Sequence, residues 1–130
     1  MSDPFEIKKF SSNHVNDIFS AIEEDPDWVF LIDGESKRDI YANRLKDSDT
    51  YVCYSGDFFC GYVRAIIDEG MAFYISELYV KPEYRNKKIG HKLIEEVKIK
   101  NSSLTVYVLS DEDRYYEKKG YKKIGSVFEL

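Results

Sequence analysis

The most constraining feature of this chain is a strand pattern, a cationic turn and a helix start that follow one another over residues 74–93. The start of a helix leaves backbone N–H groups unpaired and carries the positive end of the helix dipole. Such a helix start, placed after a strand and a turn, binds anionic groups, most often phosphates. Here Arg85, Lys87 and Lys88 lead through Gly90 into an amphipathic pattern and add side-chain charge. The segment therefore predicts a site for a phosphate-bearing cofactor.

The length of 130 residues suits one domain, residues 1–130, with a core of its own. A hydrophobic share of 43% and a charged share of 33% are ordinary for a globular protein. No window approaches the roughly 18 apolar residues of a membrane span, and the N-terminus lacks the apolar core of a signal peptide. We therefore expect a cytoplasmic protein that does not bind membranes.

The charge of the chain is unevenly distributed. The net charge of −5 argues against nucleic acid as the main partner. Residues 1–80 hold 7 basic and 16 acidic side chains, whereas residues 81–130 hold 12 and 8, so the halves carry −9 and +4. A positive half suits an anionic cofactor and a negative half suits a cationic substrate. Solubility alone is the alternative explanation.

The cysteines and histidines predict no metal or redox chemistry. Cys53 and Cys60 flank an expected hairpin turn at 55–57, and in a reducing compartment we interpret both as small buried thiols. His14 and His91 have no neighbours at metal-ligand spacing, so we expect no metal site. No pattern of nucleophile and base supports an acyl-enzyme intermediate.

Hydrophobic periodicity predicts an α/β fold with helices on both faces of the sheet. The three strands in the middle of the chain form an antiparallel meander in this prediction, and Ile40, Tyr41 and Leu45 form the apolar stripe of the second helix. A cap at Ser12 or Asn13 starts the first helix. The expected elements are strand 4–10, helices 14–24 and 36–45, strands 50–54, 58–67 and 71–80, a helix after residue 90, strand 104–109, helix 111–119 and strand 121–130.

Two motifs resemble the GNAT superfamily of N-acetyltransferases. Residues 85–90 are similar to the signature Arg/Gln-x-x-Gly-x-Gly/Ala, with Arg85 first, Gly90 last and Lys88 in place of the middle glycine. Residues 115–121 resemble the second signature, Phe-Tyr-Glu-Lys-x-Gly-Phe. The resemblance implies a single GNAT-like domain with a mixed, mostly antiparallel sheet, and acetyl-CoA or a related acyl-CoA as cosubstrate.

The resemblance also implies which residues hold the cofactor. Backbone groups of Leu78, Tyr79 and Val80 would pair with the pantetheine arm like an added strand. The loop and helix start that bind the pyrophosphate would comprise Arg85, Asn86, Lys87, Lys88, Ile89, Gly90 and His91. Ser110 stands where the family often places an asparagine that contacts the cofactor. A glycine at the position of Lys88 allows close backbone approach or a positive φ, so we expect retained but adjusted binding.

Amine acylation requires a base, because a protonated amine cannot attack a thioester. An amine with a pKa near ~10 must first lose a proton, and a carboxylate can take it directly or through water. The resemblance implies Glu77 as this base and Tyr116 as the acid that protonates the leaving thiolate. Strand alternation predicts Glu77 on the same face as Phe73, Ile75 and Tyr79. A surface role for Glu77 and a packing role for Tyr116 are the alternatives.

Taken together, these patterns predict an N-acetyltransferase that moves an acetyl group from acetyl-CoA to a primary amine by direct attack. Carboxylates and aromatics in residues 23–41 suit a cationic acceptor, such as a polyamine, an aminoglycoside or a peptide amine. The alternative is a catalytically silent acyl-CoA-binding regulatory module of the same fold, which the departures at Lys88 and Leu109 favour. Aromatic residues expected at the surface are compatible with a homodimer.

Overall fold

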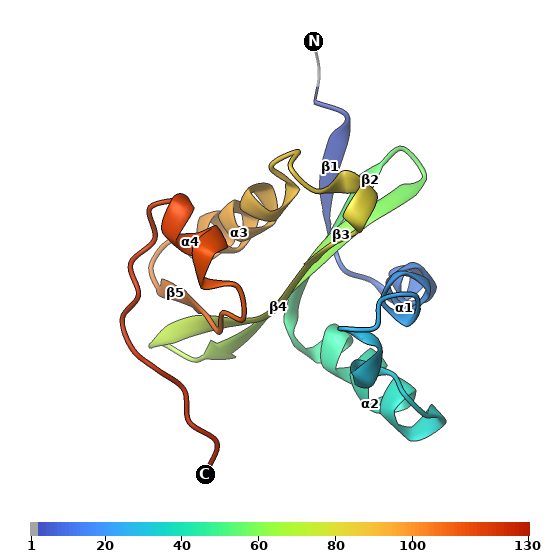
Figure 1. Ribbon diagram of the computed structural model, residues 1–130, viewed down its shortest axis with the longest axis horizontal. Helices are drawn as coiled ribbons and strands as arrows, with labels where there is room; N and C mark the ends of the chain where they lie inside the picture. The colour runs from blue at the N-terminus through green and yellow to red at the C-terminus, as the bar shows by residue number, and fades with distance from the viewer. Residues whose placement is uncertain (1–2) are drawn as a thin grey trace.

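A five-stranded sheet in the order β1-β2-β3-β4-β5 forms the centre of the structure, a computed structural model that describes residues 3–130 (Figure 1). Strands β1 to β4 pair antiparallel, and β5 runs parallel to β4. The strands are β1 (Phe5–Lys9), β2 (Asp49–Ser55), β3 (Phe58–Asp68), β4 (Ala72–Val80) and β5 (Thr105–Val108). The predicted fold class is confirmed.

Helices cover both faces of this sheet, as the sequence predicts. In Figure 1, α1 and α2 lie on one face and α3 and α4 on the other. The α-helices are α1 (Val15–Glu23), α2 (Glu35–Asp47), α3 (Ile89–Lys100) and α4 (Asp113–Lys118), and short 3-10 helices span Ser12–His14, Val29–Leu31 and Pro82–Tyr84. Within residues 3–130, none of the helices is both long and apolar enough to cross a membrane.

Two glycine turns join the central strands into the predicted meander. Gly56 links β2 to β3 with φ 59°, and Gly70 precedes β4 with φ 74°. Residues with a side chain rarely adopt this left-handed backbone, so glycine fixes both turns. The β2–β3 and β3–β4 pairs are antiparallel, and the meander is confirmed.

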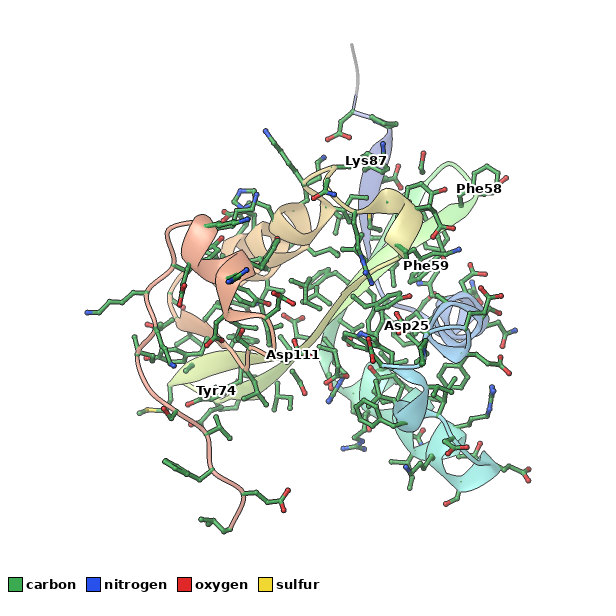
Figure 2. All side chains as sticks on the ribbon, viewed as in Figure 1. Asp25, Phe58, Phe59, Tyr74, Lys87 and Asp111 are labelled. Atoms are coloured by element: carbon green, nitrogen blue, oxygen red, sulfur yellow. The ribbon has the colours of Figure 1, made fainter. Side chains whose placement is uncertain are left out.

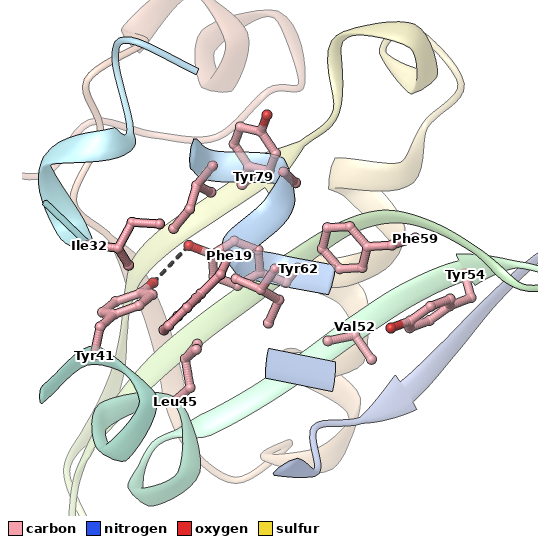
Figure 3. Packing of buried hydrophobic residues seen from close by; sticks show 12 residues of the cluster. Phe19, Ile32, Tyr41, Leu45, Val52, Tyr54, Phe59, Tyr62 and Tyr79 are labelled. Carbon is pink, nitrogen blue, oxygen red and sulfur yellow. Dashed lines mark hydrogen bonds between the residues drawn. The ribbon is translucent and has the colours of Figure 1, made fainter. Parts of the chain in front are cut away.

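The core consists of two hydrophobic clusters, one on each face of the sheet. Ile18, Leu45 and Tyr62 belong to the cluster under α1 and α2, which Figure 3 shows from close by. Val63 and Leu93 belong to the cluster under α3, and both are fully buried. Burial of each such side chain stabilises the fold by about 1.5–3 kcal/mol. The two clusters hold the sheet between its helix layers.

The first two helices differ in detail from the prediction. The first α-helix begins only at Val15, because a 3-10 turn precedes it and the backbone N–H of Ser11 donates to Nδ1 of His14 at 3.0 Å. In α2, Tyr41 is buried as predicted, whereas Ile40 is 58% exposed. The buried residues of α2, Tyr41 and Leu45, lie four positions apart on one face, and Ile40, about 100° from Tyr41 around the helix, lies outside that face.

Cys53 and Cys60 are buried and not disulfide-bonded, as predicted for small structural thiols. Burial raises the pKa of the Cys53 thiol to about 12. A protonated thiol is a poor nucleophile and a poor metal ligand. Both cysteines therefore act as apolar packing residues.

The strand predicted at 121–130 is absent, and this prediction is wrong. Gly120 adopts φ 85° after α4, and the N–H of Tyr121 donates to the carbonyl of Tyr116 at 3.1 Å. From there the chain follows an irregular, exposed path past β5 without pairing with it (Figure 1). The segment pairs with no strand within residues 3–130, so its backbone groups form no ladder of hydrogen bonds. We call residues 121–130 the tail.

Candidate functional site

A bulge in β4 reverses which side of the sheet its side chains face. Arg64 of β3 pairs with Glu77, whereas the next residue, Ala65, pairs with Ile75, so Ser76 is left without a partner. Ile75 therefore packs in the cluster under α3, while Tyr79 packs in the cluster under α1 and α2. The prediction that Glu77 shares a face with Phe73 and Ile75 is wrong, because one extra residue shifts the alternation.

The bulge also marks the point where β4 and β5 separate. The two strands pair only over residues 72–75, with a last bond from the N–H of Leu109 to the carbonyl of Ile75 at 3.2 Å. From Ser76 to Val80, the outer edge of β4 faces no strand within residues 3–130. A cavity of about 170 Å³ occupies this fork, and its walls include Trp28, Ser76, Glu77, Leu78, Ser110 and Tyr116. The fork thus brings together four residues singled out from the sequence.

Glu77 is held by three hydrogen bonds at the wall of this cavity. Arg64 donates from Nε to Oε1 at 2.6 Å and from Nη2 to Oε2 at 2.8 Å. The hydroxyl of Tyr41 donates to Oε1 at 2.5 Å. The Tyr62 hydroxyl lies 2.7 Å from that of Tyr41 and, because Tyr41 donates to Glu77, Tyr62 donates to Tyr41 (Figure 3). A carboxylate offers about four acceptor positions, so one on Oε2 remains open.

Burial keeps the partners of Glu77 in the protonation states that this network needs. Burial raises the pKa of Tyr41 well above its usual value, and Tyr62 and Glu77 raise it further. Burial also raises the pKa of Tyr62. For Arg64, burial lowers the pKa, but the hydrogen bonds and charge of Glu77 outweigh it and the pKa is raised. Both phenols therefore stay neutral donors and the guanidinium stays charged.

Tyr116, from α4, lies on the opposite side of the fork. Burial raises its pKa, and the neighbouring Tyr115 and Asp111 raise it further, so the phenol keeps its proton. Tyr115 packs edge-on against Tyr116 with ring centroids 5.0 Å apart. A Cβ added to Gly90 would lie 2.7 Å from the hydroxyl oxygen of Tyr115. The two sequence motifs are therefore in direct contact.

The start of α3 has the features of an anion site. The first backbone bond of the helix runs from the N–H of Lys92 to the carbonyl of Lys88, so the N–H groups of residues 89–91 have no acceptor within the helix. Lys88 adopts φ 66° and Asn86 φ 65°, the left-handed conformation. Lys88 thus takes the backbone shape for which glycine is normally required, and it adds a charge at the same place.

The other residues predicted to bind the cofactor differ in the groups that they can present to it. Lys87 is exposed in the loop before α3 (Figure 2), whereas Ile89 is buried and offers only its backbone. Arg85 donates from Nε to the carbonyl of Val80 at 2.9 Å. The Nδ1 atom of His91 is buried and has no hydrogen-bond partner among the described residues. The loop therefore presents lysine charge, while the Arg85 side chain braces the end of β4.

The site predicted from the sequence did not include Arg64, nor Tyr41 as a second hydrogen-bond donor to Glu77. A signal was present, because Arg64 is the one charged residue in the otherwise apolar run 58–67. A buried charge is retained when it is paired, and across an antiparallel strand that partner is Glu77. Trp28, one of the aromatic residues in the stretch 23–41 that is expected on the acceptor side, lines the cavity. No group of three or more metal-ligating side chains comes together in residues 3–130.

Comparisons with known proteins agree with this geometry. The family model described as "Acetyltransferase (GNAT) domain" matches residues 46–123. The PaiA N-acetyltransferase from Thermoplasma acidophilum, solved with coenzyme A, has a TM-score of 0.67 at 23% identity over 94% of this chain and 91% of that one. The aminoglycoside N-acetyltransferase AAC(6')-Iy, solved with CoA, has a TM-score of 0.76 at 10% identity over 97% and 93%.

A third structure is an aminoglycoside acetyltransferase from an uncultured soil metagenomic sample, in complex with sisomicin. Its TM-score is 0.68 at 15% identity over 97% of this chain and 95% of that one. At identities this low, the structural likeness shows a common fold alone. A search of curated proteins by sequence found no match.

Proposed function

This chain belongs to the GNAT acetyltransferase family, and from that premise we propose that it transfers an acetyl group from acetyl-CoA to the primary amine of a cationic acceptor. One observation carries the proposal: Glu77 and Tyr116 line the same cavity in the fork between β4 and β5. A base and an acid on opposite walls suit an amine and a thioester that meet between them.

The donor is proposed to lie along the open edge of β4. Backbone groups of Leu78, Tyr79 and Val80 would pair with the amides of the pantetheine arm, since no strand occupies that edge in residues 3–130. The unpaired N–H groups at residues 89–91 would bind the pyrophosphate, with charge supplied by Lys87 and Lys88. Ser110, at the mouth of the fork, would contact the arm from the side of β5.

Glu77 is proposed to accept the proton of the amine. Its open acceptor position on Oε2 would take the proton directly or through a water molecule, while Arg64 and Tyr41 fix the orientation of the carboxylate. The neutral amine nitrogen then attacks the thioester carbonyl carbon, and the carbon–sulfur bond breaks. A backbone N–H near Leu78 or Tyr79 would stabilise the carbonyl oxygen as charge develops on it.

Tyr116 is proposed to donate its proton to the leaving sulfur. Its raised pKa keeps the phenol protonated before the reaction, which an acid requires. Tyr116 and Glu77 line the same cavity, so the acid would meet the sulfur while the base meets the amine.

The acceptor is proposed to be a cationic amine, for which a polyamine, an aminoglycoside and a peptide amine are the candidates. The support is an acidic stretch beside Trp28, whose ring packs 5.0 Å from that of Tyr79 and borders the cavity. Acidic side chains here attract a cation toward the base. The carboxylates are Glu23, Glu24, Asp25, Asp27, Asp33 and Glu35.

A spectrophotometric assay for free CoA thiol tests the proposal against panels of polyamines, aminoglycosides and peptides. Thiol release that depends on one class of amine is the expected result. Coenzyme binding without thiol release for any amine would instead support the silent acyl-CoA-binding module. The dense hydrogen bonding of Glu77 is the structural feature that favours this second candidate.

A further inference from the structure

An ion pair joins the loop before α3 to the segment that follows α1. Nη2 of Arg85 lies 3.8 Å from Oδ2 of Asp25. The Asp25 side chain is only 14% exposed, whereas that of Arg85 is 50% exposed. Arg85 is the first residue of the proposed pyrophosphate loop, and Asp25 begins the stretch that leads to Trp28. The pair therefore connects the donor side of the molecule with the acceptor side.

The Arg85 side chain also contacts the open edge of β4. The N–H of Lys81 donates to the carbonyl of Cys60 at 2.8 Å. In the alternating pattern of an antiparallel pair, both backbone groups of the preceding residue, Val80, then point away from β3. The Val80 carbonyl that Arg85 binds through Nε at 2.9 Å thus lies on the edge proposed for the pantetheine arm.

Asp25 builds the turn that carries Trp28. Its Oδ1 accepts a hydrogen bond from the N–H of Asp27 at 2.9 Å. Its backbone carbonyl accepts from the N–H of Trp28 at 3.0 Å and from that of Val29 at 2.9 Å. Trp28 in turn lines the cavity in the fork and packs edge-on against Tyr79. A change in how firmly Asp25 is held would therefore reach a wall of this cavity.

We propose that Arg85 and Asp25 are positioning residues that transmit coenzyme binding to Trp28. This role rests on the proposed function, because it needs a coenzyme diphosphate at the start of α3. An ion pair with an exposed partner gains little, since ordering the long side chain opposes it. A coenzyme that orders the loop around Arg85 removes this cost, so Asp25 and the turn of Trp28 are held more firmly. The acceptor side is then completed once the donor is bound, and by linkage each substrate favours binding of the other.

The variant Asp25→Asn separates this role from a role in the turn alone. Asparagine makes the same turn as aspartate, because its side-chain oxygen also accepts from the N–H two residues further on. The variant therefore keeps the bond to Asp27 and removes the charge that faces Arg85. It should keep its thermal stability and lose transmission.

Trp28 is the only tryptophan of the chain, so its fluorescence during titration with 3′-phospho-ADP tests the proposal. This nucleotide half of CoA carries the diphosphate but lacks the pantetheine arm, so an effect on Trp28 passes through the protein rather than through direct contact. The wild type should change its emission with the dissociation constant that calorimetry gives. Asp25→Asn and Arg85→Met should each lose at least half of this change at saturation. The double variant should lose no more than either single variant, because both act through one bridge.

Arg44 and Asp47 provide the matched control, because they form an exposed ion pair on α2 at 3.0 Å. Arg44→Met and Asp47→Asn should both keep the emission change of the wild type. A full change in Asp25→Asn at saturation, or none in the wild type with the nucleotide bound, would overturn the bridge alone. Absence of calorimetric binding of both the nucleotide and CoA to the wild type would overturn the coenzyme site together with the bridge.

Discussion

Arg64 binds both carboxylate oxygens of Glu77 across two neighbouring strands, with N–O distances of 2.6 and 2.8 Å. The same guanidinium donates to Ser76 at 3.1 Å and to Ser48 at 3.0 Å. It therefore holds the bulge, the proposed base and the end of α2 in one network. The bulge in turn determines which face of the sheet carries Glu77.

Arg64→Met should lower the free energy of unfolding by about 3–5 kcal/mol, because it leaves Glu77 as a buried charge without its partner. Urea unfolding measures this loss. The double variant Arg64→Met/Glu77→Met should be less destabilised than Arg64→Met alone, since it removes the orphaned charge. A loss below about 1 kcal/mol, the range of an exposed ion pair, would contradict a buried network.

Glu77→Gln should lower kcat about a hundredfold or more and leave the CoA dissociation constant nearly unchanged, because it removes only proton acceptance. Steady-state kinetics and CoA titration measure the two effects. Glu69→Gln, in the exposed turn before β4, is the matched control and should change neither. Wild-type turnover across the pH range would exclude Glu77 as the base.

Tyr116→Phe should also lower kcat, by about tenfold to a hundredfold, since water can partly replace a phenol as acid. Burial raises the pKa of Tyr116, so its proton is lost only at a pH above the usual phenol value of about 10. The kcat of the wild type should therefore show no decline from this group below pH 10. A decline in wild type near neutral pH that disappears in Tyr116→Phe would contradict this assignment.

Gly90→Ala should destabilise the protein by about 1–3 kcal/mol, because its Cβ would lie 2.7 Å from the Tyr115 hydroxyl oxygen. Adding Tyr115→Phe removes that oxygen, and the nearest remaining ring atom lies 3.5 Å away, an ordinary contact. Thermal unfolding should therefore show recovery in the double variant. Equal destabilisation of both variants would show that the contact with the Tyr115 hydroxyl is not what destabilises Gly90→Ala.

Lys88→Gly should stabilise the fold by about 0.5–1 kcal/mol, because glycine relieves part of the cost of a left-handed residue. Lys88→Ala keeps that backbone cost and should leave stability near that of wild type. Both variants lose one charge and should weaken CoA binding equally, by about tenfold at most. Different CoA affinities for the two variants would show that backbone shape, rather than charge, decides binding here.

Local signals explain the parts of the fold that the sequence predicts well. Gly56 and Gly70 set the turns of the meander because their backbone geometry needs no distant partner. The buried face of α3, with Leu93 and Val97, follows helical periodicity. The cationic segment and Gly90 mark the start of that helix, which the structure places beside the open edge of β4.

Features that depend on distant contacts were not predictable in the same way. No glycine or proline marks the bulge at Ser76, which lies next to the pair that Arg64 and Glu77 form across the strands. The alternation of side chains along a regular strand therefore predicts the wrong face of the sheet for Glu77. A strand also depends on a partner for its backbone groups, and residues 121–130 pair with no strand within residues 3–130.

Isothermal titration of the chain with CoA at low and high salt tests the proposed coenzyme site itself. The open edge of β4 and the lysine-bearing start of α3 predict one site per chain, a micromolar dissociation constant, and weaker binding at high salt because phosphate contacts are screened. The Lys87→Ala/Lys88→Ala variant should bind more weakly and lose most of the salt dependence. No detectable binding at high micromolar CoA, or binding indifferent to both salt and these lysines, would contradict the account.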